Sequence, residues 1–166
     1  MRKVTRIAFI TVAILFFLVP NVKAKYWETC EESLKGIRSI FVLVNAHSDL
    51  KKLGITNEKI KTDVELKLRT AGINVLSGDL SGIEPGLSVV VWGVEHENLV
   101  YYTISVSLRQ NVKLSRNLNL ECYSKTWEST WAGLTQADRL EQKARIVIKD
   151  MIDEFLNEYL TVNSKK

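Results

Sequence analysis

The first regular pattern in the chain is a nearly unbroken apolar run rich in β-branched residues. Residues 37–46 read IRSIFVLVNA, with no alternation between apolar and polar positions after Ser39. Such a run is typical of a strand that is covered on both faces. We therefore expect a central strand of a sheet here.

A helix is predicted directly after this strand. Thr56 is a suitable N-cap, and Ile55 and Ile60 occupy the two positions of a hydrophobic staple. Gly72 fits the left-handed position after the last turn, and Ile73 can pack back onto the helix as in a Schellman ending. The apolar positions that share one helical face are Ile60, Val64, Leu68 and Ala71.

Four more strands are expected in the middle of the chain. Residues 74–77 form a short strand, and the segment SGDLSGIEPG after it breaks regular structure. Residues 87–94 form the next strand. Residues 100–114 alternate between apolar and polar positions, which is typical of an antiparallel strand with one solvated face. Residues 118–131 supply its partner, so the last three strands form a meander.

The last element is a long amphipathic helix. Thr135 followed by Asp138 resembles a capping box with Asp in the Glu position. The predicted order is therefore β-α-β-β-β-β-α, an α/β (α+β) two-layer sandwich whose mixed sheet of about five strands carries both helices on one face. The apolar stripe comprises Leu140, Ala144, Val147, Ile148, Met151, Phe155 and Tyr159, while Arg145, Lys149, Asp153 and Glu154 face outward.

Residues 1–24 have the three parts of a cleavable signal peptide. Arg2, Lys3 and Arg6 precede an apolar run over residues 7–18, and small residues lie at Val22 and Ala24. Cleavage is predicted between Ala24 and Lys25. The alternative is a retained anchor, but a membrane span needs about 20 apolar residues and this run is shorter.

The charge balance changes once the leader is removed. Four of the 23 basic residues lie in residues 1–24, which contain no acidic residue, so the remaining 19 basic side chains equal the 19 acidic ones. This balance disfavours nucleic acid as a partner, because binding to phosphates needs a basic excess. We expect an amino-terminal segment over residues 25–36, one domain over residues 37–162 and a frayed tail over residues 163–166.

The two cysteines have two interpretations. Exported proteins meet oxidising conditions, so Cys30 and Cys122 can form a disulfide that ties the amino-terminal segment to the sheet. The alternative is a pair of buried thiols, which suits Cys122 because it is in phase with Leu118 and Leu120. No C-x-x-C pair is present, so a thioredoxin-like redox motif and a zinc ribbon both lack ligands.

Several segments together resemble a known group of proteins. They are LKGIRSIFVLV, LRTAGI, PGLSVVVWGV, ISVSLRQNVKLSR, KTWESTW and IDEFLNEYLTVN. The chain resembles uncharacterised bacterial secreted proteins whose domain is similar to the amino-terminal domain of the Tol-system propeller protein, and to envelope lipoproteins that help curli secretion or activate penicillin-binding proteins. The resemblance implies a module of the cell envelope and transfers no catalytic residue. The chain departs from the lipoproteins because Cys30 follows Trp27, Glu28 and Thr29 rather than a box of small residues.

Residues suited to catalysis or metal binding are few. His47 and His96 are the two histidines, with Asp49, Glu95 and Glu97 nearby in sequence. Neither histidine has a partner at a spacing typical of zinc ligands. No nucleophile elbow, cysteine-protease signature or glycine-rich phosphate loop is present. We therefore expect no cofactor, no bound metal and no assembled catalytic group.

Two surfaces of the predicted sheet are candidates for binding. Tyr123, Trp127 and Trp131 alternate with Lys125 between them, and we expect this aromatic stripe to belong to the core rather than to a binding site. The polar face of the long strand offers hydroxyls and a guanidinium on a rigid platform. Its residues are Tyr101, Thr103, Ser105, Ser107 and Arg109.

The sequence therefore predicts a periplasmic or secreted module with no membrane anchor after cleavage. Its expected function is non-enzymatic: it binds another envelope protein or a surface component through the open sheet face or a sheet edge. The alternative is a small hydrolase or metal-dependent enzyme built around His47 or His96.

Overall fold

The computed structural model describes residues 31–77 and 84–164 of the chain. The predicted cleavage site between Ala24 and Lys25, and Cys30, lie outside these residues. The elements in chain order are η1 (Glu31–Leu34), β1 (Ser39–Ala46), η2 (Ser48–Leu53), α2 (Asn57–Thr70), β2 (Asn74–Leu76), β3 (Gly86–His96), β4 (Leu99–Leu114), β5 (Asn117–Gln136), η3 (Ala137–Arg139) and α3 (Leu140–Asn163).

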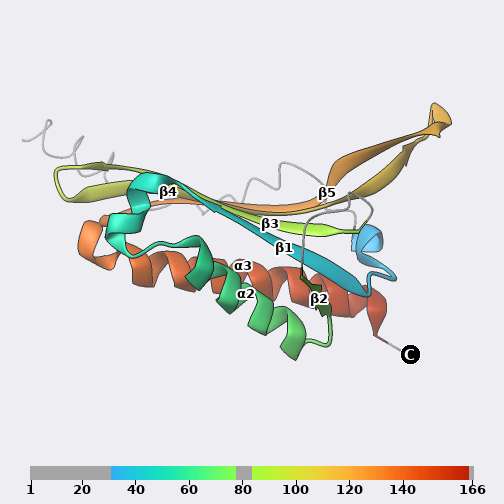
Figure 1. Ribbon diagram of the computed structural model, residues 1–166, viewed down its shortest axis with the longest axis horizontal. Helices are drawn as coiled ribbons and strands as arrows, with labels where there is room; N and C mark the ends of the chain where they lie inside the picture. Colours follow the sequence, from blue (N-terminus) through green and yellow to red (C-terminus); the bar gives the residue numbers. More distant parts are fainter. Residues whose placement is uncertain (1–30, 78–83, 165–166) are drawn as a thin grey trace, which may run out of the picture.

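The strands form one mixed sheet in the order β2-β1-β3-β4-β5. β1 is parallel to both β2 and β3, whereas β3, β4 and β5 form an antiparallel meander. Both α2 and α3 cover the same face of this sheet, and no helix among the described residues lies on the other face (Figure 1). The predicted two-layer fold with this order of strands and helices is confirmed.

The start and end of α2 follow from its capping residues. The Thr56 Oγ1 accepts a hydrogen bond from the backbone N–H of Lys59 at 3.3 Å, and Ile55 and Ile60 are both buried. At the other end the chain passes through Gly72 at φ +84°, and the N–H of Ile73 donates to the carbonyl of Leu68 at 3.0 Å. The predicted N-cap, staple and Schellman ending are therefore confirmed.

The core lies between the sheet and the two helices. Alternate positions of β4 are buried against the helices from Val100 to Leu108, as the period of two predicts. From α3 the buried residues are Leu140, Ala144, Ile148, Met151, Ile152, Phe155 and Leu156. One continuous apolar cluster therefore joins α2, α3 and the sheet.

Coverage of β1 differs between the two faces of the sheet. Ile40 and Val42 are buried beneath the helices, but Leu43 on the other face is 40% exposed. The prediction of a strand covered on both faces is wrong at Leu43. β1 is nevertheless an interior strand, because it has hydrogen-bonded neighbours on both sides.

The start of α3 also differs from the prediction. Thr135 lies within β5, where it pairs with Val100, and it does not cap a helix. The helix instead follows the short turn η3, and its N-cap residue Arg139 makes no side-chain capping bond. The capping-box interpretation fails because β4 and β5 stay paired as far as Gln136, which holds Thr135 in extended conformation.

Asn163, the last residue of α3 and the first of the predicted frayed tail, is fixed by contacts with η1 and the segment after it. The Asn163 side-chain amide donates to the carbonyls of Leu34 and Tyr159, each at 2.9 Å, and its Oδ1 accepts from the N–H of Gly36 at 2.7 Å. Leu34 is fully buried. These contacts tie the segment before β1 to the last turn of α3.

Candidate binding face

The predicted polar residues of β4 all lie on the face of the sheet opposite the helices, because they alternate with the buried positions. Tyr101 and Arg109 are exposed, and Thr103 and Ser105 are half-buried. Ser107 is only 5% exposed, which contradicts its assignment to a solvated face. Its cross-strand neighbours Ser88 and Glu128 flank it on both sides.

Next to these residues, β3 places large apolar side chains on the same open face. The register aligns Val94 with Tyr101 and then Leu134, and Trp92 with Thr103. We call the resulting surface the sheet-face patch. Its residues are Val90, Trp92, Val94, Tyr101 and Leu134, which are 39%, 44%, 51%, 48% and 65% exposed.

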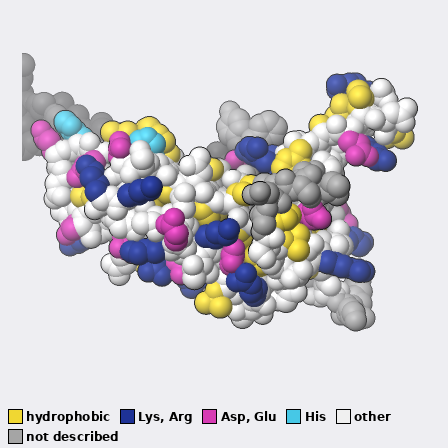
Figure 2. All heavy atoms as spheres, viewed as in Figure 1, with side chains coloured by type: hydrophobic (Ala, Val, Ile, Leu, Met, Phe, Trp, Pro, Cys, Tyr) yellow, Lys and Arg dark blue, Asp and Glu magenta, His cyan; other side chains and the backbone are white. Residues whose placement is uncertain are grey.

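The patch lies close to the β3–β4 turn. Hydrophobic side chains gather beside the histidines along the upper left of Figure 2, over this end of the sheet. Single exposed apolar residues are common on protein surfaces, but a contiguous group on a rigid sheet is typical of an interaction surface. The sheet-face patch is therefore the strongest candidate site among the described residues.

Polar groups border the patch along β5. The Ser105 hydroxyl donates to Glu128 Oε1 at 3.0 Å, and the Lys125 ammonium pairs with the same oxygen at 2.5 Å. The Thr130 hydroxyl donates to Ser105 Oγ at 3.4 Å. These interactions hold the β4 and β5 side chains in fixed positions beside the apolar group.

At the same end of β3, but on the helix face of the sheet, Lys52 of η2 pairs with Glu95 at 2.7 Å. The hydrogen bond from Lys52 to Glu95 raises the pKa of Lys52 above its ordinary value. This ion pair therefore lies on the opposite face of the sheet from the patch, and the described polar groups that border the patch are those on β4 and β5.

The two histidines have different surroundings. His47 follows β1, its ring lies 6.2 Å from that of Trp92 between centroids, and its Nδ1 is 3.8 Å from a carboxylate oxygen of Asp49. His96 lies at the end of β3, with 87% of its side chain exposed. Within residues 31–77 and 84–164, no group of three or more His, Cys, Asp and Glu residues is arranged to hold a metal ion.

The aromatic stripe predicted on β5 is split between the two faces. Trp127 is buried at 2% exposure, as expected for core, and Trp131 is 37% exposed with its ring 5.0 Å from that of Tyr102. Tyr123 lies on the open face, which contradicts the predicted single stripe. The cause is a β-bulge: Leu108 pairs with Trp127 but Arg109 pairs with Lys125, so Thr126 is an extra residue that changes the alternation.

Tyr123 is held in this position by its hydroxyl, which donates to the carbonyl of Glu84 at 3.4 Å. Partial burial raises the pKa of Tyr123 above that of a free phenol. Of the two interpretations of the cysteines, the buried thiol is wrong for Cys122, since Cys122 is exposed. Its proposed bond with Cys30 involves a residue outside the described part of the chain.

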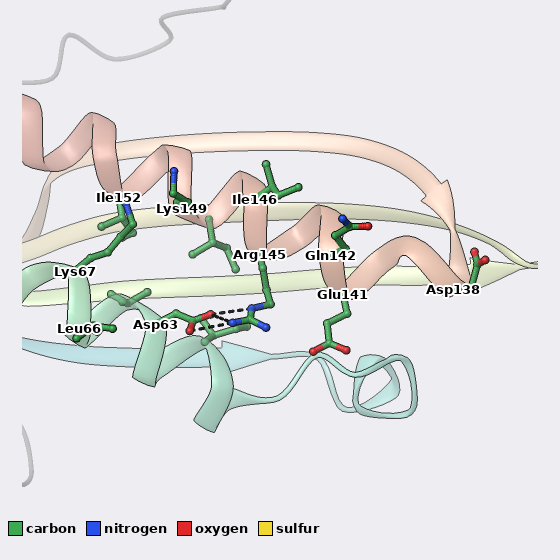
Figure 3. A pocket seen from close by; sticks show the side chains of 13 residues that line it. Asp63, Leu66, Lys67, Asp138, Glu141, Gln142, Arg145, Ile146, Lys149 and Ile152 are labelled. Atoms are coloured by element: carbon green, nitrogen blue, oxygen red, sulfur yellow. Dashed lines mark hydrogen bonds and ion pairs between the residues drawn. The ribbon is translucent and has the colours of Figure 1, made fainter.

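A second concave surface lies between α2 and α3. It encloses about 610 Å³, and its floor includes Ile60, Val64, Ile148 and Ile152. Its charged groups pair across the groove: Arg145 donates two hydrogen bonds to Asp63 at 2.9 and 3.1 Å (Figure 3). These charges therefore neutralise one another instead of converging on a shared ligand position.

Two more ion pairs cross between the same helices. Lys59 pairs with Glu141 at 2.9 Å, and its hydrogen bond holds the pKa of Glu141 below the ordinary value. Lys67 donates to Asp153, which likewise lowers the pKa of that carboxyl group. The ion pairs thus join α2 to α3. This structural role accounts for the charged residues along the groove without a bound ligand.

Sequence reasoning missed the apolar half of the candidate face. Val90, Trp92 and Val94 belong to a run in which both alternating sets of positions are apolar, and that run was interpreted only as a strand. The available signal was that one set must face away from the helices in a two-layer fold. The exposed Leu66 of α2 and Ile146 of α3, which line the groove, carried no comparable signal.

Comparison with known proteins finds distant structural similarity only. The chain matches no protein family's sequence profile and no curated protein. Solved structures similar to it include an uncharacterised protein (11% identity, 71% of this chain and 92% of that chain, TM-score 0.42). A second is a dodecamer of a PelC variant from Paraburkholderia phytofirmans, with 12% identity over 78% of this chain and 89% of that chain and a TM-score of 0.42. A third is lipoprotein GNA1162 from Neisseria meningitidis, with 14% identity over 72% of this chain and 98% of that chain and a TM-score of 0.36.

These likenesses are too distant to assign a function. The resemblance to the Tol-system and other envelope proteins therefore stays a prediction. Within the described part of the chain, no helix combines the length and apolar character that crossing a membrane requires.

Proposed function

We propose that this chain is an exported, non-enzymatic module of the cell envelope that binds a partner protein through the sheet-face patch. The observation that carries the proposal is the exposure of Val90, Trp92, Val94, Tyr101 and Leu134 together on the face of the sheet away from the helices. When a partner covers these side chains, their apolar surface is removed from water, and this burial favours association. The predicted leader would deliver the module to the periplasm or the outside of the cell.

The chemistry of the patch defines the partner. Trp92 and Tyr101 are the aromatic types that dominate binding energy at protein interfaces, and they lie on neighbouring strands of a rigid ladder. The ion pair between Lys125 and Glu128 lies beyond the other end of the patch, next to Val90. Val90 pairs with Ser105, and Glu128 pairs with Ser107 on the next rung. The expected partner therefore presents an apolar surface surrounded by groups that hydrogen-bond, rather than a phosphate-rich polymer.

The test is site-specific photo-cross-linking in intact cells. A photoreactive residue replaces Trp92 in one variant of the full chain, and Leu66 on α2 in a matched control. Leu66 is 63% exposed and belongs to the helix layer, on the far side of the sheet from the patch. We expect a discrete adduct at position 92 and none at position 66.

A second variant, Val94→Lys, places a charge inside the patch. Val94 is exposed, so the fold should change in stability by no more than about 0.5 kcal/mol, while the adduct at position 92 should be lost. No adduct at position 92, or equal adducts at both positions, would contradict the proposal.

A further inference from the structure

β5 forms one edge of the sheet and runs along the long axis of the molecule (Figure 1). Among the described residues its only strand neighbour is β4, which it pairs with as far as Gln136. We call residues 127–136 the outer edge. Alternate residues of such a strand direct their N–H and C=O groups away from the sheet. No described element other than β4 forms a backbone hydrogen bond with the outer edge.

The outer edge lacks the features that usually protect an edge strand from pairing. Natural edge strands are kept short, or carry a bulge, proline or lysine. β2, at the other edge of the sheet, has three residues and is protected by its shortness. The outer edge instead has the ten residues WESTWAGLTQ, with neither proline nor lysine. Its one charged side chain, Glu128, is paired with Lys125. This stretch of β5 is therefore suited to the addition of another strand.

Side chains on both faces of the outer edge are exposed. Thr130, Ala132 and Leu134 are exposed on the face away from the helices. On the helix face, Trp131 is 37% exposed, although its cross-strand neighbour Ile104 on β4 is fully buried. A strand beside β5 would remove apolar surface of Trp131 and Leu134 from water, and this burial favours association.

A second copy of the outer edge is the occupant that fits. The backbone groups of an edge strand are satisfied by another edge strand, and β2 is too short to match ten residues. Two copies related by a twofold axis pair in antiparallel fashion, so the same surface serves on both sides. Two strands of this length form about ten backbone hydrogen bonds, which is a typical number for a specific protein interface.

The side chains favour one register for this pairing. Residues that lie opposite one another share a face of the sheet, so the twofold axis passes through a residue rather than between two. The middle of the outer edge offers Trp131 and Ala132. An axis at Trp131 places the carboxylate of Glu128 opposite the apolar Leu134, which is an unfavourable pair.

An axis at Ala132 gives complementary pairs instead. Glu128 then faces the amide of Gln136, and the hydroxyls of Ser129 and Thr135 face each other, so both pairs can form hydrogen bonds. The charged Glu128 side chains of the two copies stay apart. Trp131 lies opposite Gly133, which has no side chain to oppose the indole ring.

We propose that two copies of this chain associate through their outer edges, with Ala132 on the twofold axis. The axis is perpendicular to the sheet, so the two five-stranded sheets become one continuous sheet. The helices of both copies then lie on one side of it, and the two sheet-face patches lie on the other. The interface forms without the partner protein of the proposed function.

Analytical ultracentrifugation of the purified full chain tests this association with no partner present. We expect a reversible equilibrium between monomer and dimer. Ala132→Lys places two like charges opposite each other on the axis, so the dissociation constant should rise about tenfold or more. Val94→Lys is the matched control, because Val94 is exposed on β3 and lies outside the outer edge. It should leave the dissociation constant unchanged, and circular dichroism should show that both variants fold.

Disulfide trapping tests the register in a Cys30→Ser/Cys122→Ser background, which has no native thiol. Ala132→Cys should link two copies by itself, because opposite Cα atoms lie about 4.5–5.5 Å apart, within the range of a disulfide. Thr130→Cys alone should not link, because the two Thr130 Cα atoms would be about 14 Å apart. Addition of Leu134→Cys to Thr130→Cys should produce the link, since these positions face each other between copies.

Three results would overturn the proposal. The first is a chain that stays monomeric over the whole concentration range, as expected if another strand covers the outer edge. The second is an association that Ala132→Lys leaves unchanged or that Val94→Lys abolishes. The third is linkage from Thr130→Cys alone as efficient as that from Ala132→Cys. None of these results decides whether the patch binds a partner protein, because photo-cross-linking at Trp92 tests that binding separately.

Discussion

Truncation of Trp127 is expected to cause one of the largest losses of stability in the chain. Trp127 is fully buried where β5 meets α3, and its ring packs edge-on against Phe155 with 5.2 Å between centroids. Its indole N–H donates to a carboxylate oxygen of Glu158 at 2.7 Å. Trp127→Ala removes both interactions and leaves a cavity beneath the sheet.

The expected magnitude follows from these contacts. Replacement of a buried Trp or Phe by Ala costs about 3–5 kcal/mol in the free energy of unfolding. A hydrogen bond to a charged group contributes about 1.5–3 kcal/mol, which is the loss expected for Trp127→Phe because the ring contact with Phe155 is largely kept. Since domains of this size unfold with about 5–15 kcal/mol, Trp127→Ala should leave a marginal fold.

Urea denaturation, monitored by circular dichroism, measures the loss for Trp127→Ala and for Trp127→Phe. The shift in midpoint gives the loss of stability where the dependence of the unfolding free energy on urea concentration is unchanged. Trp131→Ala is the matched control. Its ring contacts Tyr102 but is 37% exposed, so the loss should be about 1–2 kcal/mol. If Trp127→Ala cost no more than Trp131→Ala, burial against α3 would not be the source of stability.

Two further predictions concern the ion pairs and turns. Because Lys67 lowers the pKa of Asp153, the ionised carboxylate stabilises the folded state above its unfolded pKa, and this contribution is lost as pH falls through the lower folded pKa. Lys67→Met should therefore flatten the decline of the thermal midpoint between neutral pH and about pH 3. Gly54→Ala and Gly72→Ala should both cost about 1 kcal/mol through positive φ. Gly54→Ala should cost more than Gly72→Ala. The methyl group added at position 54 meets the carboxylate of Glu141, whereas the methyl group added at position 72 meets no atom within 4 Å. The urea midpoints of the two variants measure this difference.

The fold was predictable because its patterns are local and repeated. The alternation along β4 decides which face meets the helices, and the cap at Thr56 with Gly72 at the other end fixes α2 within one turn. The start of α3 was not predictable in the same way. Thr135 has a favourable capping sequence, but long-range pairing with Val100 holds it in β5, and no local signal reports that pairing.

The candidate face was predicted in part. Tyr101 and Arg109 could be placed because a polar set alternates with an apolar one along their strand. The face of Tyr123 could not, because a single inserted residue at Thr126 reverses the alternation, and a bulge leaves no distinctive residue type in the sequence. A one-residue difference in register is enough to move an aromatic side chain from the core to the surface.

The same bulge separates two parts of β4. On one side of it, Tyr101 belongs to the patch near the β3–β4 turn. On the other side, Gln110 and Val112 lie beyond the start of β3 at Gly86, where β4 pairs only with β5, and Val112 is about 35 Å along the strand from Tyr101. The patch faces away from the helices, whereas Cys122 projects toward the side of η1. A partner that covers the patch therefore leaves the outer part of the β4–β5 hairpin, with the exposed Cys122, in contact with water.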